Sequence, residues 1–191
     1  MQGADLQVVL AELSPPARLA AAHAPAAARG AWIVFLALDE RLGRIVANAT
    51  EPMLAQLRLA WWRDRLRESP ERRPRGEPLL ALLPAWEAEL PALEALVDGW
   101  EAMVGEAGPP ARSALAEARV EAILALARLV GARDDPLRVE AAARRWAQAE
   151  SGSAVPLGRA MRPLAILAAL AGGDRGLRAW LRIVRLGLLG R

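Results

Sequence analysis

Apolar residues recur at helical spacing along the whole chain of 191 residues, and no other sequence feature restricts the fold as strongly. β-Branched residues are scarce, and no alternating apolar and polar run continues beyond a few positions. Proline and glycine separate the helical segments, and no repeat or long linker divides the chain. The sequence therefore predicts an all-α protein, with residues 1–191 forming a single domain built as an irregular helical bundle.

The positions of proline and glycine also predict where the helices lie. The expected segments are 5–13, 17–23, 26–47, 50–68, 79–104 with breaks at its prolines, 111–130, 136–150, 157–171 and 175–189. Residues 69–78 are rich in proline, arginine and glutamate and are expected to form an exposed loop. One helical stripe is expected to be buried, and it consists of Leu93, Leu96, Val97, Trp100 and Val104.

The composition excludes several kinds of catalytic and metal site. The chain has no cysteine and a single histidine, His23. Disulfides, thiolate nucleophiles and cysteine-containing zinc sites are therefore excluded. A histidine-rich metal cluster is excluded as well, and so is a second histidine to serve a catalytic triad.

Charge and hydropathy narrow the expected partners and location. All 25 basic residues are arginine, against 22 acidic residues, and a net charge of +3 does not favour nucleic-acid binding. The longest apolar stretch, residues 163–173, has about half of the ~20 residues that a bilayer span needs. The N-terminal segment carries Asp5 and Glu12 and does not have the pattern of a signal peptide. These observations predict a cytoplasmic protein.

Asp39 is the most informative single residue. Its helical face is otherwise apolar and carries Trp32, Phe35, Leu36, Leu42 and Val46. An unpaired charge on such a face costs several kcal/mol, so an arginine, a metal ion or protonation of the carboxyl must compensate it. We expect Asp39 to point inward and to bind an arginine, with Arg58 as the first candidate. The neighbouring Glu40 is expected at the surface, paired with Arg44 four residues later.

The segment EPMLAQLRLAWWRD, residues 51–64, combines tryptophan and arginine on one helix. Trp61 follows Leu54 and Leu57 at helical spacing, whereas Trp62 aligns with Arg58 and Arg65. Interleaved arginine and tryptophan can stack on nucleic-acid bases. Because this pattern occurs on a single helix without a wider basic patch, we expect the tryptophans to serve core packing and the arginines to form a solvated edge. The pattern therefore predicts that Trp61 belongs to the core and that Trp62 lies nearer the surface or a groove.

Taken together, these two segments read ALDERLGRIVANATEPMLAQLRLAWWRDRL and resemble the squalene/phytoene synthase family over residues 37–66. The helical order supports the resemblance, including LEALVDGWEAMV and the closing RPLAILAALA and LRIVRLGLLGR. The resemblance implies the all-α terpenoid (isoprenoid) synthase fold. Active members hold Mg²⁺ through two aspartate-rich motifs, and these ions bind the diphosphate of a prenyl donor.

The chain departs from the motifs that carry this activity. Asp39 and Glu40 correspond to the first motif, but Gly43 stands where a second carboxylate is expected. Near the second motif, Glu150 is present without an aspartate pair. This pattern is similar to a divergent branch of the family that includes an assembly factor of mitochondrial respiratory complex I.

Three functions follow as expectations. The leading one is a non-catalytic protein without a cofactor that binds a partner protein or an isoprenoid lipid. The second is an Mg²⁺-dependent prenyltransferase that joins prenyl diphosphates, with Arg58, Trp61 and Trp62 beside its cavity. The third is peripheral membrane contact through the predicted helix over residues 175–189, which has an apolar stripe opposite three arginines.

Overall fold

The computed structural model describes residues 2–105, 107–150 and 155–171. Within these ranges every regular element is a helix, which confirms the predicted all-α class. The elements are α1 (Gln2–Glu12), α2 (Pro15–Ala22), α3 (Ala26–Ala47), α4 (Pro52–Arg67), α5 (Pro78–Ala81), the 3₁₀ helix η1 (Leu83–Glu89), α6 (Leu90–Glu101), α7 (Pro109–Leu129), α8 (Pro136–Ala147), the 3₁₀ helix η2 (Arg159–Met161) and α9 (Arg162–Ala171). The predicted helix over residues 175–189 lies outside the described residues.

Polar side chains and prolines determine where several helices begin. The Ser14 hydroxyl accepts a hydrogen bond from the backbone N–H of Ala17 at the start of α2. The Asp135 carboxylate accepts one from Leu137 at the start of α8. Such caps satisfy backbone N–H groups that a helix end leaves unpaired. Because these signals are local, the predicted boundaries agree with the observed ones to within a few residues.

Prolines divide the segment that was predicted as an interrupted helix over residues 79–104. Pro84 lies in the first turn of η1, and Pro91 lies in the first turn of α6. A proline is tolerated there because its missing N–H has no partner within the helix. The preceding loop is largely exposed as predicted, except that Arg73 is buried and donates to Glu87 at 3.2 Å.

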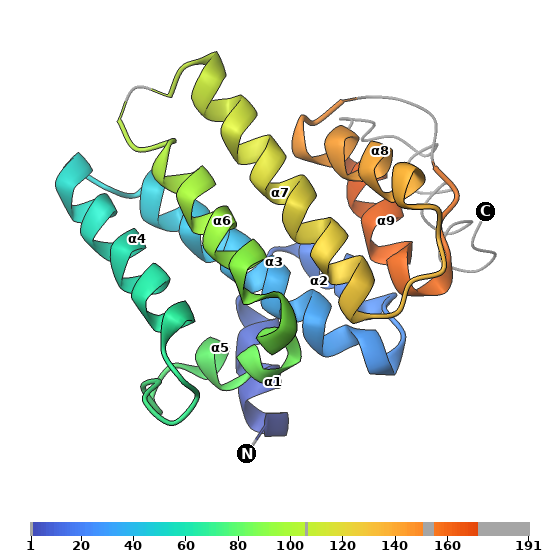
Figure 1. The fold of residues 1–191 in the computed structure, drawn as a ribbon, viewed down its shortest axis with the longest axis horizontal. Coiled ribbons are helices and arrows are strands. Elements are labelled where there is room, and N and C mark those ends of the chain that lie inside the picture. Colours follow the sequence, from blue (N-terminus) through green and yellow to red (C-terminus); the bar gives the residue numbers. More distant parts are fainter. Residues whose placement is uncertain (1, 106, 151–154, 172–191) are drawn as a thin grey trace.

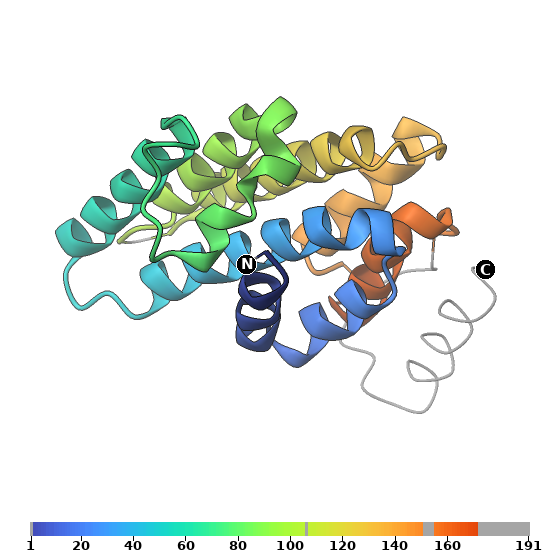
Figure 2. The ribbon, with the colours of Figure 1, turned by 90° about the horizontal axis from the view of Figure 1, so that it is seen from below.

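The central element of the bundle is α3, which contacts α1, α2, α4, α6 and α7 (Figure 1). Figure 2 shows α1 and α2 on the opposite side of α3 from α6 and α7. Helix α4 lies at one edge of the bundle, where it packs against α6 and α3. At the other end α8 contacts α7, and α9 contacts α2 and α8.

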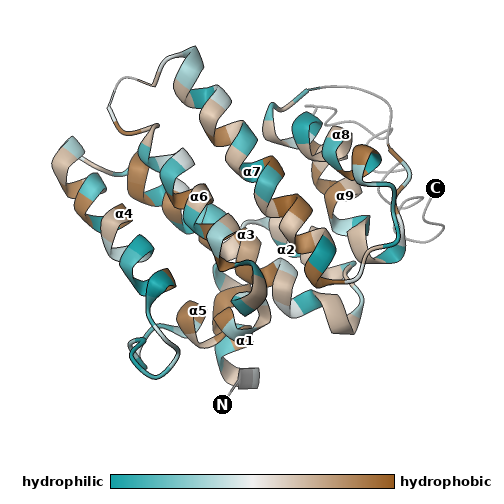
Figure 3. Ribbon diagram, viewed as in Figure 1, coloured by the Kyte–Doolittle hydropathy of each residue, from teal (hydrophilic) through white to brown (hydrophobic). Residues whose placement is uncertain are grey.

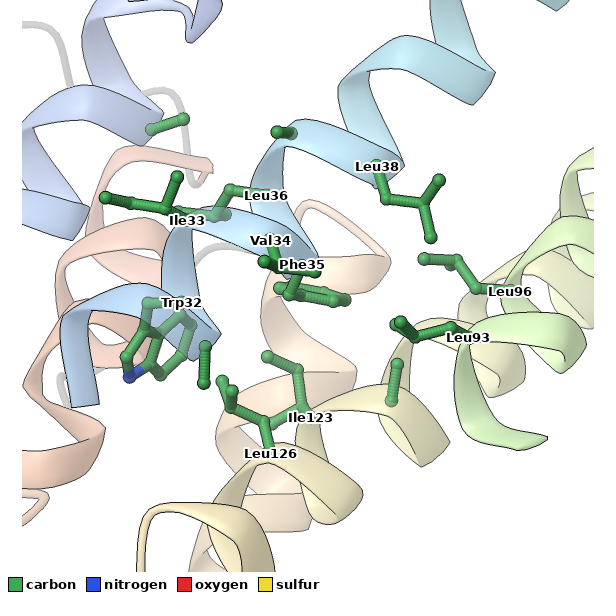
Figure 4. Close-up of a cluster of buried hydrophobic side chains, with 14 of the residues drawn as sticks. Trp32, Ile33, Val34, Phe35, Leu36, Leu38, Leu93, Leu96, Ile123 and Leu126 are labelled. Carbon is green, nitrogen blue, oxygen red and sulfur yellow. The ribbon is translucent and has the colours of Figure 1, made fainter. Parts of the chain in front are cut away.

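A continuous apolar core surrounds α3. Residues 31–38 are all buried, so this stretch packs against neighbours on every side, as an apolar central helix must. Figure 4 shows this stretch of α3 with Leu93 and Leu96 of α6 and with Ile123 and Leu126 of α7. Phe35 stacks on Trp86 with ring centroids 6.4 Å apart.

One glycine allows α6 and α7 to approach closely. A Cβ atom added at Gly99 would lie 2.8 Å from the Cβ of Ala118 and 3.2 Å from the Cα of Leu115. Leu93, Leu96 and Val97 of the predicted stripe are fully buried, whereas Trp100 and Val104 are half-buried. Across the described residues, no helix combines the length and the hydropathy that a membrane span requires.

Candidate functional site

Asp39 points into the protein from the C-terminal half of α3. Its exposed fraction is 4%, so the prediction of an inward-facing carboxylate is confirmed. The carboxylate is bound by an arginine, as predicted, but the partner is Arg119 of α7 rather than Arg58. Arg58 is exposed because α4 turns a different face toward the core than the sequence pattern suggested.

Both carboxylate oxygens of Asp39 accept hydrogen bonds. The Nε and Nη2 atoms of Arg119 lie 3.0 Å from Oδ1 and 2.9 Å from Oδ2, respectively, which is a bidentate pair. The indole Nε1 of Trp100, on α6, also donates to Oδ1 at 2.8 Å. Asp39 therefore connects three helices, and its buried charge is compensated within the protein.

Two tryptophans enclose the guanidinium of Arg119. Its Cζ atom lies 5.0 Å from the ring centroid of Trp100 and 5.2 Å from that of Trp146, which belongs to α8. An arginine over an aromatic face is attracted by the ring quadrupole. We refer to Asp39, Trp100, Arg119 and Trp146 as the Asp39 cluster; its four side chains come from α3, α6, α7 and α8.

A sequence signal for Arg119 existed but was not used in the prediction. Arg119 interrupts an apolar stripe on α7 that includes Leu115, Ala116, Ala122 and Ile123, all of them buried. A cation in such a stripe needs a compensating anion, just as Asp39 needs a cation. Matching the two residues from sequence would have required knowing that α3 and α7 pack side by side.

Glu40 was predicted to lie at the surface, but it is half-buried and contacts the start of α2. Its carboxylate accepts hydrogen bonds from the backbone N–H of Ser14 at 2.9 Å and from the Ser14 hydroxyl. The predicted pair with Arg44 is present, at 3.9 Å. Glu40 thus joins α3 to the N-terminal cap of α2.

Gly43 provides the space that Trp100 occupies. A Cβ atom at this position would lie 2.9 Å from Cη2 and 3.0 Å from Cζ2 of the Trp100 indole. Because contacts this short force a neighbour to move, the absence of a side chain at Gly43 lets Trp100 reach Asp39. Where the resemblance implies a second carboxylate, the structure places an indole ring.

Replacing Gly43 by alanine is therefore expected to destabilise the protein, although alanine is the better helix former. We expect the free energy of unfolding to fall by about 1–3 kcal/mol, the usual cost of overpacking. Gly30→Ala, on the same helix, is the matched control because a Cβ atom there meets nothing within 4 Å. That control should gain up to about 1 kcal/mol. Equal stabilisation of both variants in urea unfolding would contradict the packing of Trp100 against Gly43.

The residues around Asp39 do not fit a magnesium site. Mg²⁺ binds carboxylate oxygens that are free to coordinate it, with water or phosphate filling the remaining positions. The Asp39 oxygens are held by Arg119 and Trp100, and both Glu40 oxygens accept from Ser14. Glu150 is exposed beyond the end of α8. No group of three or more acidic or histidine residues that could hold a metal occurs within the described part of the chain.

Two grooves flank the Asp39 cluster and share Trp100, Met103 and Arg119. One, of about 580 Å³, lies between the C-terminal half of α3 and α6, and Val46 and Ala47 also line it. The other, of about 530 Å³, lies between α7 and the end of α8. Most of the exposed area in both linings is apolar, and charged residues, among them Glu40, Arg44 and Arg112, lie at their walls.

The structure reverses the predicted roles of the two adjacent tryptophans. Trp62 is 4% exposed and belongs to the core, whereas Trp61 is 39% exposed. The buried stripe of α4 consists of Ala55, Leu59, Trp62 and Leu66. The prediction was wrong because α4 has two apolar stripes. The helix packs against the bundle with this buried stripe and not with the stripe that contains Trp61. Arg58, Trp61 and Trp62 do not line the two grooves beside the Asp39 cluster.

Comparisons of the chain with protein-family models, with curated proteins and with solved structures found no match.

Proposed function

We propose that this protein is a non-catalytic binding protein with a helical domain of the terpenoid synthase type, as the sequence resemblance implies. The single observation that carries the proposal is the state of Asp39. Its carboxylate, the best candidate for a metal ligand, is bound on both oxygens by Arg119 and Trp100. This pair connects α3 to α6 and α7 and engages both oxygens that a substrate-bound metal would need.

The chemistry of prenyl transfer explains why this matters. A departing diphosphate carries several negative charges, which metal ions neutralise in the transition state. Recruiting Asp39 for that purpose would break two hydrogen bonds from Arg119 and one from Trp100. It would also leave the Arg119 guanidinium, enclosed by two tryptophans, without its anion. Both costs support a structural role for Asp39.

The grooves beside the cluster support binding of an apolar chain. They meet at Trp100 and Met103, and their apolar lining suits a prenyl chain better than a polar metabolite. We propose an isoprenoid lipid as the ligand, in keeping with the resemblance. The proposal retains the cytoplasmic location expected from the sequence.

One experiment tests both parts of the proposal. Purified protein is incubated with labelled farnesyl or geranylgeranyl diphosphate and with Mg²⁺ or Mn²⁺, and diphosphate release and retained lipid are measured together. We expect no diphosphate release above that of heat-inactivated protein. We expect lipid retention to fall several-fold in Met103→Glu, because a carboxylate in the shared part of the grooves opposes an apolar chain.

Two controls make the result decisive. Leu137→Glu introduces the same charge at a residue that is 72% exposed in the first turn of α8 and lines neither groove, so it should leave lipid retention unchanged. Metal-dependent diphosphate release that disappears in Asp39→Ala would overturn the non-catalytic assignment. Equal retention by the Met103 and Leu137 variants would overturn the grooves as the lipid site.

A further inference from the structure

Helix α4 exposes a contiguous apolar surface on the side that faces away from the bundle. This outer face consists of Met53, Leu54, Leu57 and Trp61, which are 67%, 45%, 62% and 39% exposed. The four residues lie at helical spacing over the first three turns of α4 and so form one strip. Figure 3 shows apolar and hydrophilic residues alternating along this helix at the edge of the bundle.

The inner side of α4 is apolar as well. Its buried stripe of Ala55, Leu59, Trp62 and Leu66 already packs against the bundle. A surface helix normally has one apolar face and one polar face, whereas a helix that is apolar on both sides is typical of one packed between two neighbours. Contiguous exposed apolar surface of this kind commonly marks an interaction site.

The charges beside the outer face indicate what covers it. Arg63 and Arg67 pair with α6, and Arg65 pairs with Glu68. Arg58 and Glu51, in contrast, are exposed, and their side chains have no ion-pair or hydrogen-bond partner within the ranges that the structure describes. They are seven residues apart, which places them two turns from each other on the same edge of the strip.

We propose that the outer face of α4 binds a second copy of this chain, with the two α4 helices antiparallel about a two-fold axis. Such an interface is self-complementary: where one residue contacts a second residue across the axis, the symmetry repeats the same contact with the two chains exchanged. With the axis midway between Leu54 and Leu57, Leu54 lies opposite Leu57 of the second copy. On the shared edge, Arg58 then comes within reach of Glu51 of the second copy, and the reverse pair forms by symmetry.

The same charges argue against an anionic membrane as the occupant. Among the described arginines beside the strip, Arg58 is the one without an ion-pair partner. Two exposed carboxylates, Glu51 and Asp64, border the strip at its two ends. Anionic lipid would repel both carboxylates. Because a single helix face buries less surface than a standard interface, we expect a concentration-dependent equilibrium between one chain and two.

A charge-exchange experiment on the full chain tests this pairing by analytical ultracentrifugation. Each of Glu51→Arg and Arg58→Glu places like charges across the axis, and we expect the dimer Kd to rise roughly tenfold. The double variant restores opposite charges and should return the Kd to near its original value. Residues 51 and 58 are too far apart on one helix to pair with each other, so this rescue requires two chains.

The absence of cysteine permits a second, independent test. Leu57→Cys introduces a single thiol within one turn of the two-fold axis, and a short bis-maleimide cross-linker should link two chains efficiently. Leu137→Cys is the matched control, because Leu137 is 72% exposed on α8 and should give little linked product. Wild-type protein that sediments as one chain at every concentration would overturn the proposal. So would equal linking of the two variants, or binding to anionic vesicles that Leu57→Glu abolishes without any self-association.

Discussion

Replacing Trp62 by alanine is expected to lower the free energy of unfolding by about 3–5 kcal/mol, the usual cost of truncating a buried tryptophan. The Trp62 side chain is 4% exposed and packs between α4 and the rest of the bundle. The Arg41 guanidinium also lies over its ring, with Cζ 5.4 Å from the centroid. The cavity left by the indole cannot close, because well-packed neighbours relax only in part.

Trp61→Ala is the matched comparison because it removes the same side chain one residue earlier. Trp61 is 39% exposed and contacts Trp62 edge-on, with centroids 5.1 Å apart. Losing that contact, and the contact with Arg65, whose Cζ atom lies 5.8 Å from the Trp61 centroid, should cost about 1 kcal/mol. Chemical denaturation of both variants measures the difference. If Trp61→Ala proved the more damaging change, the packing face of α4 would be wrong, and so would the proposed dimer surface.

Replacing Asp39 by alanine is expected to cost about 3 kcal/mol of stability. Breaking a buried ion pair from one side typically costs 3–5 kcal/mol, and the lower end applies here because the Arg119 side chain keeps 20% exposure. The Trp100 indole N–H would lose its acceptor at the same time. Asp64→Ala, which removes an exposed aspartate on α4, should change stability by less than about 0.5 kcal/mol.

A double-mutant cycle separates the ion pair from simple loss of volume. Arg119→Met removes the stranded cation while keeping a long apolar side chain between Trp100 and Trp146. Combined with Asp39→Ala, it should recover part of the lost stability, because the largest penalty comes from the unpaired charge. Strictly additive losses in thermal and urea unfolding would show that Asp39 and Arg119 are not energetically coupled.

Local sequence signals were sufficient to predict most helices. Proline, glycine and capping residues act within one or two turns, so the predicted segment 26–47 coincides with α3 (Ala26–Ala47). The buried stripe at Leu93, Leu96 and Val97 was also predictable, because residues at that spacing share one face of any helix. That Asp39 would point inward and need a compensating partner followed from its apolar face alone.

The identity of the arginine could not be predicted in the same way. Arg119 lies 80 positions further along the chain and meets Asp39 because α3 and α7 pack against each other. Arg58 was chosen because the helices next to each other in sequence were expected to exchange contacts. Helical periodicity describes each helix separately and contains no information about which helices become neighbours.

The orientation of α4 was decided by the tertiary structure for the same reason. Its two apolar stripes are comparable in sequence, so amphipathicity by itself did not distinguish inside from outside. The acidic face of α6 makes the difference: Asp98 accepts from Arg63 at 2.8 Å and Glu94 from Arg67 at 2.6 Å. These pairs, together with burial of Trp62, turn Arg58 and Trp61 outward. Sequence thus determined the helices and the need to compensate Asp39, whereas the choice of partners depended on contacts summed over the whole bundle.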